Sequence, residues 1–134
     1  MSKVMKIERF EDIEAWKAGR DLKSIYEITK EKRFSRDFSL LDQIRRAAVS
    51  ITSNIAEGFE RGGDNEFIQA LAIAKGSSGE VRSQLYVALD EQYITATQFD
   101  EISKKALAVS RLIGGFMKYL QGSSLRGSKF KDRG

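Results

Sequence analysis

The sequence predicts an all-α protein, and three observations support this prediction. Proline, which breaks helices, is absent from all 134 residues, although an average usage of about 5% would give roughly six or seven. Good helix formers such as Ala, Leu, Lys and Glu are abundant. Apolar residues recur at intervals of three and four along most of the chain, which is the period of an amphipathic helix. We therefore expect one domain, folded as an antiparallel up-down-up-down four-helix bundle.

The first two helices are predicted at residues 11–31 and 39–61. The apolar stripe of the first helix comprises Ala15, Ala18, Leu22, Ile25 and Tyr26. The apolar arc of the second helix comprises Leu40, Leu41, Ile44, Ala48, Ile51, Ile55 and Phe59. Ser39 is the expected N-cap of the second helix, with Asp42 three residues later. The pair Gly62-Gly63 is a typical helix stop.

The third and fourth helices are predicted at residues 64–93 and 95–121. Asp64 is the expected N-cap of the third helix, and Thr95 begins the capping-box pattern TATQ of the fourth. The stripe of the third helix comprises Phe67, Leu71, Ala74, Ser78, Val81, Leu85 and Ala88. The stripe of the fourth comprises Phe99, Ile102, Ala106, Val109, Ile113, Phe116 and Leu120. Because the links between these helices are short, consecutive helices should be antiparallel neighbours.

Basic residues gather in two clusters. The segment KEKRFSR contains Lys30, Lys32, Arg33 and Arg36 against one acid. Residues 122–134, which we expect to be a disordered basic tail, contain Arg126, Lys129, Lys131 and Arg133 against Asp132. The tail therefore carries +3 of the total net charge of +4. Two basic clusters on a nearly neutral body are a weak indication of a polyanionic partner, and composition alone favours ordinary solvated surface charge.

Missing residue types exclude several classes of site. The chain has no histidine and no cysteine, which removes Ser-His-Asp triads, thiolate nucleophiles and the usual zinc and di-iron sites. We expect no cofactor, no metal site and no enzymatic activity. No segment approaches the ~18 consecutive apolar residues of a membrane span, and the first residues lack the apolar core of a signal peptide. We therefore expect a cytoplasmic protein.

A polar stripe runs beside the apolar arc of the second helix. The stripe and its neighbours in the third helix comprise Gln43, Arg46, Ser50, Asn54, Glu57 and Glu80. Because an isolated buried charge costs several kcal/mol, any buried carboxylate in this set needs a partner. We interpret the set as a structural seam that joins the second and third helices, within one chain or between subunits. Ligand recognition and catalysis are the alternatives.

Glycines interrupt the third and fourth helices. Gly76 and Gly79 lie in mid-helix, and Gly114 and Gly115 adjoin one another in the next helix. Each glycine inside a helix costs about 0.5–1 kcal/mol relative to alanine. Close approach by another helix is the favoured explanation. The run AKGSSGE lacks the residue order of a phosphate-binding loop.

The motif QIRRA-x-x-S-I-x-x-N-I-A-E-G, followed downstream by G-S-x-x-E, resembles a known family. This family comprises bacterial four-helix-bundle proteins encoded in intervening sequences of the large-subunit ribosomal RNA gene. It is related to the accessory variability determinant of diversity-generating retroelements. The resemblance covers most of residues 10–94. One departure is RFSRDF, in which Ser35 follows Phe34 where the family usually has proline.

The resemblance implies an antiparallel four-helix bundle that assembles into a ring-like homopentamer. It implies no known catalytic activity. In the retroelement relatives, basic surfaces bind nucleic acid and the protein associates with a reverse transcriptase. The resemblance also implies an architectural role for the polar stripe described above.

Three functions remain open. We favour an oligomeric, non-enzymatic accessory protein that binds RNA or DNA through the two basic clusters. The second is a protein–protein scaffold that docks a polymerase-type enzyme, such as a reverse transcriptase, through exposed Val49 or Ala56. The third is a Mg²⁺-dependent nucleotide hydrolase, suggested by the E-x-x-E pair Glu57 and Glu60. That activity needs a second acidic cluster, which the sequence lacks.

Overall fold

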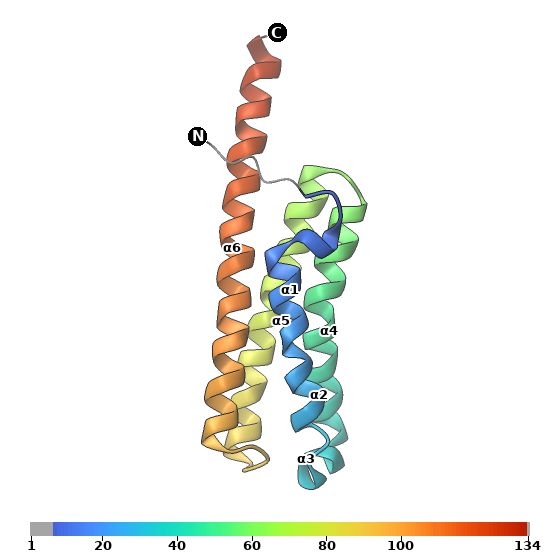
Figure 1. Cartoon of the computed structure of the whole chain (residues 1–134), viewed down its shortest axis with the longest axis vertical. Coiled ribbons are helices and arrows are strands. Elements are labelled where there is room, and N and C mark those ends of the chain that lie inside the picture. Colours follow the sequence, from blue (N-terminus) through green and yellow to red (C-terminus); the bar gives the residue numbers. More distant parts are fainter. Residues whose placement is uncertain (1–6, 134) are drawn as a thin grey trace.

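The computed structural model describes residues 7–133, and the side chains of residues 7–122. In this part of the chain every regular element is a helix. The longer helices lie side by side along one long axis (Figure 1). The predicted all-α class is confirmed. None of the described helices is sufficiently long and apolar to cross a membrane.

The first predicted helix is divided into short elements. They are η1 (Phe10–Asp12), α1 (Glu14–Arg20), η2 (Asp21–Lys23) and α2 (Ser24–Ile28). Ile13 has an extended backbone, with φ −77° and ψ 121°, and this separates η1 from α1. Arg20, Lys23 and Ser24 keep right-handed helical angles through η2. The α1–α2 segment therefore continues as one rod with a tightened turn.

A short helix, α3 (Lys32–Arg36), lies where the sequence suggested a loop. The carboxylate of Glu31 caps it by accepting from the backbone N–H groups of Arg33 and Phe34, at 3.0 and 2.9 Å. These two hydrogen bonds lower the pKa of Glu31 below its ordinary value. The Phe34 side chain is completely buried. Capping and burial together fix this turn.

The next helix, α4 (Phe38–Glu60), begins after Asp37, whose carboxylate accepts from the N–H of Leu40 at 3.1 Å. The prediction of Ser39 as the cap is wrong because Asp37 reaches the same first turn two residues earlier. Gly62 ends α4 with a φ of +82°, as the glycine pair predicted.

The following helix, α5 (Asp64–Asp90), has Gly63 as its N-cap rather than Asp64, and no side chain caps it. It ends three residues before the predicted Tyr93. Gln92 has a φ of +60°, and the N–H of Tyr93 bonds to the carbonyl of Ala88 at 2.9 Å. This is a Schellman turn with a residue other than glycine in the left-handed position.

The last helix, α6 (Ala96–Arg133), begins with the predicted capping box. The N–H of Thr95 donates to Gln98 Oε1 at 2.9 Å, and the N–H of Gln98 donates to Thr95 Oγ1 at 3.1 Å. The helix continues through residues 122–133, where the sequence predicts a disordered tail. Its C-terminal part projects beyond the other helices (Figure 1).

The apolar core lies where the helices meet. α4 packs against α5, α5 packs against α6, and α1 contacts both α4 and α6. The largest completely buried aliphatic side chains are Leu22, Ile25, Ile44, Ile51, Ile55, Leu71, Leu85 and Ile113. All of them belong to the predicted stripes, so the hydrophobic period correctly identified the packed faces.

Candidate nucleic-acid interface and polar contacts between helices

Part of the predicted polar seam joins α4 to α5 within one chain. Ser77 donates its hydroxyl proton to Ser50 Oγ at 2.9 Å. Asn54 Nδ2 donates to the carbonyl oxygen of Ser50 at 2.8 Å and to its Oγ at 2.9 Å. Ser77 is buried, and Ser50 and Asn54 are half-buried. These small polar groups therefore satisfy one another at the helix contact.

A second polar contact lies farther along the same two helices. Gln84 Nε2 donates to Gln43 Oε1 at 3.4 Å, and Gln43 Nε2 donates to Ser39 Oγ at 3.1 Å. Gln43 is exposed. The long first distance and this exposure make it a weaker link than the serine pair.

The charged residues of the predicted seam lie at the surface. The side chain of Glu57 is 65% exposed and lies 3.9 Å from Arg61, and Arg46 is 79% exposed and lies 2.9 Å from Asp42. Glu80 is also exposed. None of these charges crosses from α4 to α5 through an ion pair among the described residues. Hydroxyl and amide groups, not carboxylates, make the seam.

A third polar contact, between α5 and α6, is absent from the sequence-based prediction. Ser78 is completely buried and donates to the carbonyl oxygen of Ala106 at 2.7 Å, while Ser110 donates to Ser78 Oγ at 2.9 Å. The hydrophobic period alone assigns Ser78 to an apolar stripe. The signal for the contact is a hydroxyl among apolar residues, which must find a partner when buried.

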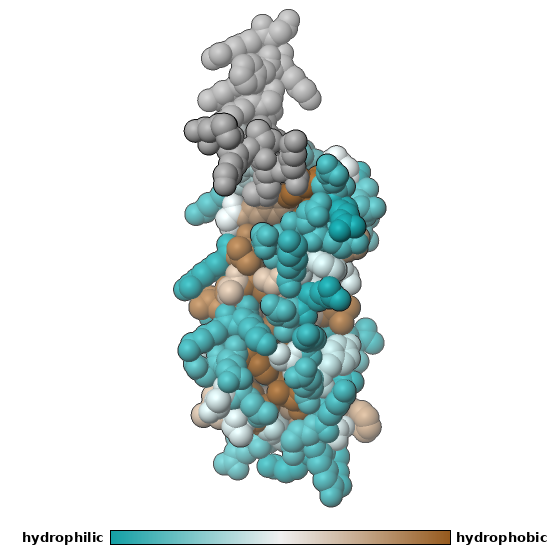
Figure 2. Space-filling view, in the orientation of Figure 1, coloured by the Kyte–Doolittle hydropathy of each residue, from teal (hydrophilic) through white to brown (hydrophobic). Residues whose placement is uncertain are grey.

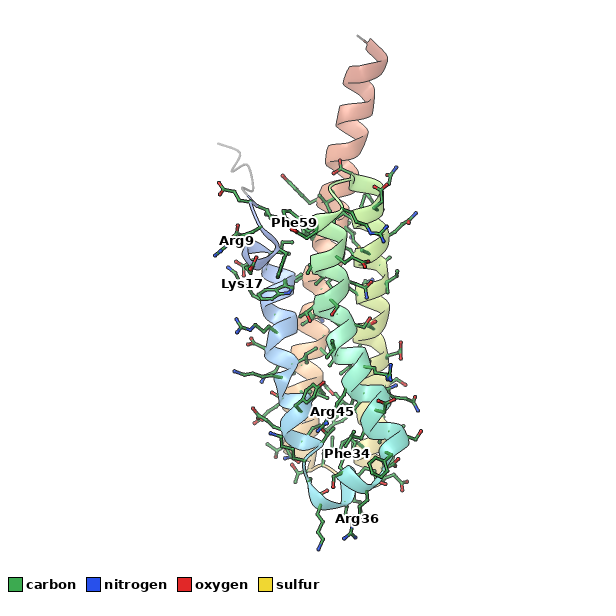
Figure 3. The ribbon with its side chains drawn as sticks, turned by 90° about the vertical axis from the view of Figure 1, so that its right-hand side faces the viewer. Arg9, Lys17, Phe34, Arg36, Arg45 and Phe59 are labelled. Carbon is green, nitrogen blue, oxygen red and sulfur yellow. The ribbon has the colours of Figure 1, made fainter. Side chains whose placement is uncertain are left out.

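Arg45 joins α4 to α2. Its Nε donates to Thr29 Oγ1 at 2.9 Å, and its guanidinium lies 4.5 Å from the ring centroid of Tyr26. Arg45 extends from α4 towards α2 (Figure 3). A helical wheel places Arg45 on the outer face. Its length allows it to cross to a neighbouring helix while its charge stays partly solvated.

The basic cluster around α3 divides into two groups. Arg33 donates to the carbonyl oxygens of Glu91 and Gln92 at 3.3 and 3.4 Å, and its guanidinium lies 5.5 Å from the ring centroid of Tyr93. It therefore fastens α3 to the C-terminal end of α5, where backbone carbonyls attract a cation. The Tyr93 hydroxyl donates to Asp37 at 3.0 Å, and this raises the pKa of Tyr93.

The other three cations of this cluster remain available to contact a polyanion. Lys30, Lys32 and Arg36 are exposed, and none makes an ion pair with a described residue. Arg36 lies at one extreme end of the molecule (Figure 3). We name these three residues the α3 cation group.

The second predicted cluster lies at the opposite end of the molecule. Residues 126–133 form the projecting end of α6, whereas α3 is at the other end (Figure 1). The side chains of Arg126, Lys129, Lys131 and Arg133 lie outside the described side chains. Within one chain the two clusters therefore do not form a continuous surface.

Acidic side chains within the described residues do not gather in any group of three or more that could hold a metal ion. The pair Glu57 and Glu60 belongs to α4, where Glu57 lies beside Arg61. Several of the polar side chains that have hydrogen-bond partners join one helix to another. The fold and these contacts thus define an all-helical bundle protein whose polar side chains organise its packing.

The chain belongs to the family described as 23S rRNA-intervening sequence protein, whose family model matches residues 11–115. The resemblance noted in the sequence is confirmed. Among curated proteins, none matches significantly.

The fold is similar to a crystal structure of a protein with unknown function from the S23 ribosomal protein family of Bacteroides thetaiotaomicron. The TM-score is 0.68 and the sequence identity 23%, and the match covers 78% of this chain and 94% of the other. At this identity the likeness concerns the fold.

Proposed function

We propose that this chain is a non-enzymatic accessory protein of the cytoplasm that binds RNA or DNA through basic surfaces. We further propose that it works as a ring-like homo-oligomer, a pentamer, of antiparallel up-down-up-down four-helix bundles. The α3 cation group is the observation that carries the proposal. It presents three exposed cations at one end of the molecule with no carboxylate of the described residues paired to them.

Oligomerisation answers the objection that one chain has a net charge of only +4. A ring repeats each modest patch once per subunit, so weak contacts act together on one long polyanion. The family description refers to an intervening sequence of 23S rRNA. RNA is therefore the first nucleic acid to test.

The test combines light scattering with RNA binding over a range of salt concentrations. Binding should weaken steeply as salt rises, because cations on the protein displace counterions from phosphates. A variant with Lys30→Gln and Lys32→Gln should reduce the dependence of log affinity on log salt, by about 0.7 for each single-strand phosphate that the variant no longer neutralises. The charge-matched control is Lys17→Gln with Lys23→Gln, on α1 and η2.

Three results would each refute part of the proposal. RNA and DNA affinities that barely change with salt would exclude binding through phosphates. A monomeric mass in light scattering would exclude the ring and, with it, the repetition of each basic patch in every subunit. Equal effects of the α3 variant and its control would show that the α3 cation group does not touch the nucleic acid.

A scaffold function is the second candidate because large apolar side chains are exposed. Val49 is 46% exposed, and Ile73 and Tyr86 are 56% and 58% exposed. On the face seen in Figure 2, apolar patches alternate with hydrophilic side chains. Val49→Asp should abolish copurification with a coexpressed reverse transcriptase and leave RNA binding intact if this surface docks the enzyme.

A further inference from the structure

A groove of about 890 Å³ runs between α5 and α6. Its floor is formed by small residues that include Gly76 and Gly79 on α5 and Gly114 and Gly115 on α6. A Cβ atom added at Gly76, Gly79 or Gly115 would meet no other atom within 4 Å. Contacts within the chain therefore do not explain why the poorest ordinary helix former occupies these positions.

The charged residues that line this groove are all cations. Lys75 and Arg82 extend from α5, and Arg111 and Lys118 extend from α6. All four are exposed, no Asp or Glu lines the groove, and none of the four makes an ion pair with a described residue. This set is distinct from both clusters that the sequence suggested.

The four cations face the groove from both helices. α5 and α6 run in opposite directions, because a short link joins them and Ser78 contacts Ser110. Ser78 also contacts Ala106, so Lys75 on α5 and Arg111 on α6 lie at about the same level. Lys118 lies towards one end of the groove, and Arg82 lies towards the other.

We propose that this glycine-floored groove receives the phosphate backbone of a nucleic-acid strand. The cations contact its phosphates from both sides, and the missing side chains on the floor allow the strand to approach both helices. This inference rests on the proposed nucleic-acid function and names the surface that performs it. A basic groove that follows the backbone is the usual device for binding single strands without sequence preference.

Charge favours a nucleic-acid strand over a second copy of the chain whose own cationic groove would face this one. Such a contact would place two cationic rims against each other, whereas a phosphate strand neutralises both.

The test measures binding of fluorescent oligo(U) at several salt concentrations. The groove variant is Lys75→Gln with Lys118→Gln, and the matched control is Lys17→Gln with Lys23→Gln. Arg111 is left intact because it also borders a cavity beside Asp12 and Glu14. The groove variant should reduce the slope of log affinity against log salt by about 1.4, and the control should leave it unchanged.

A second variant, Gly79→Leu, tests the floor without changing any charge. Nothing within 4 Å opposes its Cβ, so circular dichroism should show an intact helical fold. Oligo(U) affinity should fall about tenfold or more, while the mass from light scattering stays that of the wild type.

The outcomes separate this inference from the proposed function. Salt-sensitive binding by the wild type, with the groove variant matching its control, would overturn the groove and leave the proposed function standing. If Gly79→Leu changed the mass from light scattering but not the oligo(U) affinity, the groove inference would be overturned. The groove would then be a contact with a second copy of the chain. Absence of any salt-sensitive binding by the wild type would overturn both.

Discussion

Gly58→Ala should destabilise the fold, although alanine is the better helix former. Gly58 lies in α4 where this helix packs tightly against α5. An alanine Cβ there would lie 2.5 Å from Ala70 Cβ and 3.1 Å from Phe67 Cδ1. Ordinary carbon contacts are about 3.5–4.0 Å, so the helices would have to separate locally by about 1 Å.

The expected loss follows from two opposing effects. Overpacking a well-packed contact costs typically about 1–3 kcal/mol, and removing a helical glycine returns about 0.5–1 kcal/mol. We expect a net decrease of about 1 kcal/mol in the free energy of unfolding, the middle of this difference. Gly79→Ala is the matched control, because its Cβ meets nothing within 4 Å. It should raise the free energy of unfolding by about 0.5–1 kcal/mol.

Urea denaturation followed by circular dichroism, at one protein concentration and without nucleic acid, measures both variants. The slope with denaturant should be unchanged, so that the midpoint reports stability. Equal stabilisation by the two substitutions would refute the close approach of α4 and α5. A loss of stability in Gly79→Ala would show that another chain occupies the groove in the free protein.

Three further predictions concern helix ends and buried polar groups. Gln92→Gly should raise the free energy of unfolding by about 1 kcal/mol in urea denaturation, because the φ of +60° suits glycine; no gain would contradict the Schellman turn. Ser78→Ala should lower it by about 1–2 kcal/mol, because Ser110 loses its acceptor, whereas exposed Ser53→Ala should be nearly neutral. The pKa of Tyr93 should exceed its ordinary value of 10.0 because its hydroxyl donates to Asp37. Its contribution to stability should therefore be complete below that value and be lost as pH rises through the raised one. Tyrosinate absorbance should show that Tyr93→Phe removes an ionisation above the ordinary value, and removal of one at or below that value would contradict the contact.

The packed faces were predictable because they depend on local period. Every member of the predicted stripes of the third and fourth helices is buried or half-buried. The first helix was less regular: Tyr26 is 40% exposed, and Arg45 covers one side of its ring from α4. A helical wheel treats each helix alone, so it cannot include a side chain that crosses from a neighbour.

Helix boundaries were less predictable because several nearby residues could cap each end. Ser39 and Asp64 are good caps by residue type, yet Asp37 and Gly63 occupy the N-cap positions of α4 and α5. The buried Phe34 and the contact of Tyr93 with Asp37 fix the chain before α4. Contacts between residues distant in sequence therefore decided which of several nearby residues caps each helix.

The sequence by itself determined the helical class, the faces that pack and the chemistry that is unavailable to a chain without histidine or cysteine. Only the tertiary structure decided which polar groups meet and which cations remain exposed. It engages Arg33 with the end of α5, leaves the α3 cation group in solvent, and brings Lys75, Arg82, Arg111 and Lys118 to one groove. The reason is physical. Hydrophobic period is a property of one helix, whereas a groove and its charge depend on the distance and register between two.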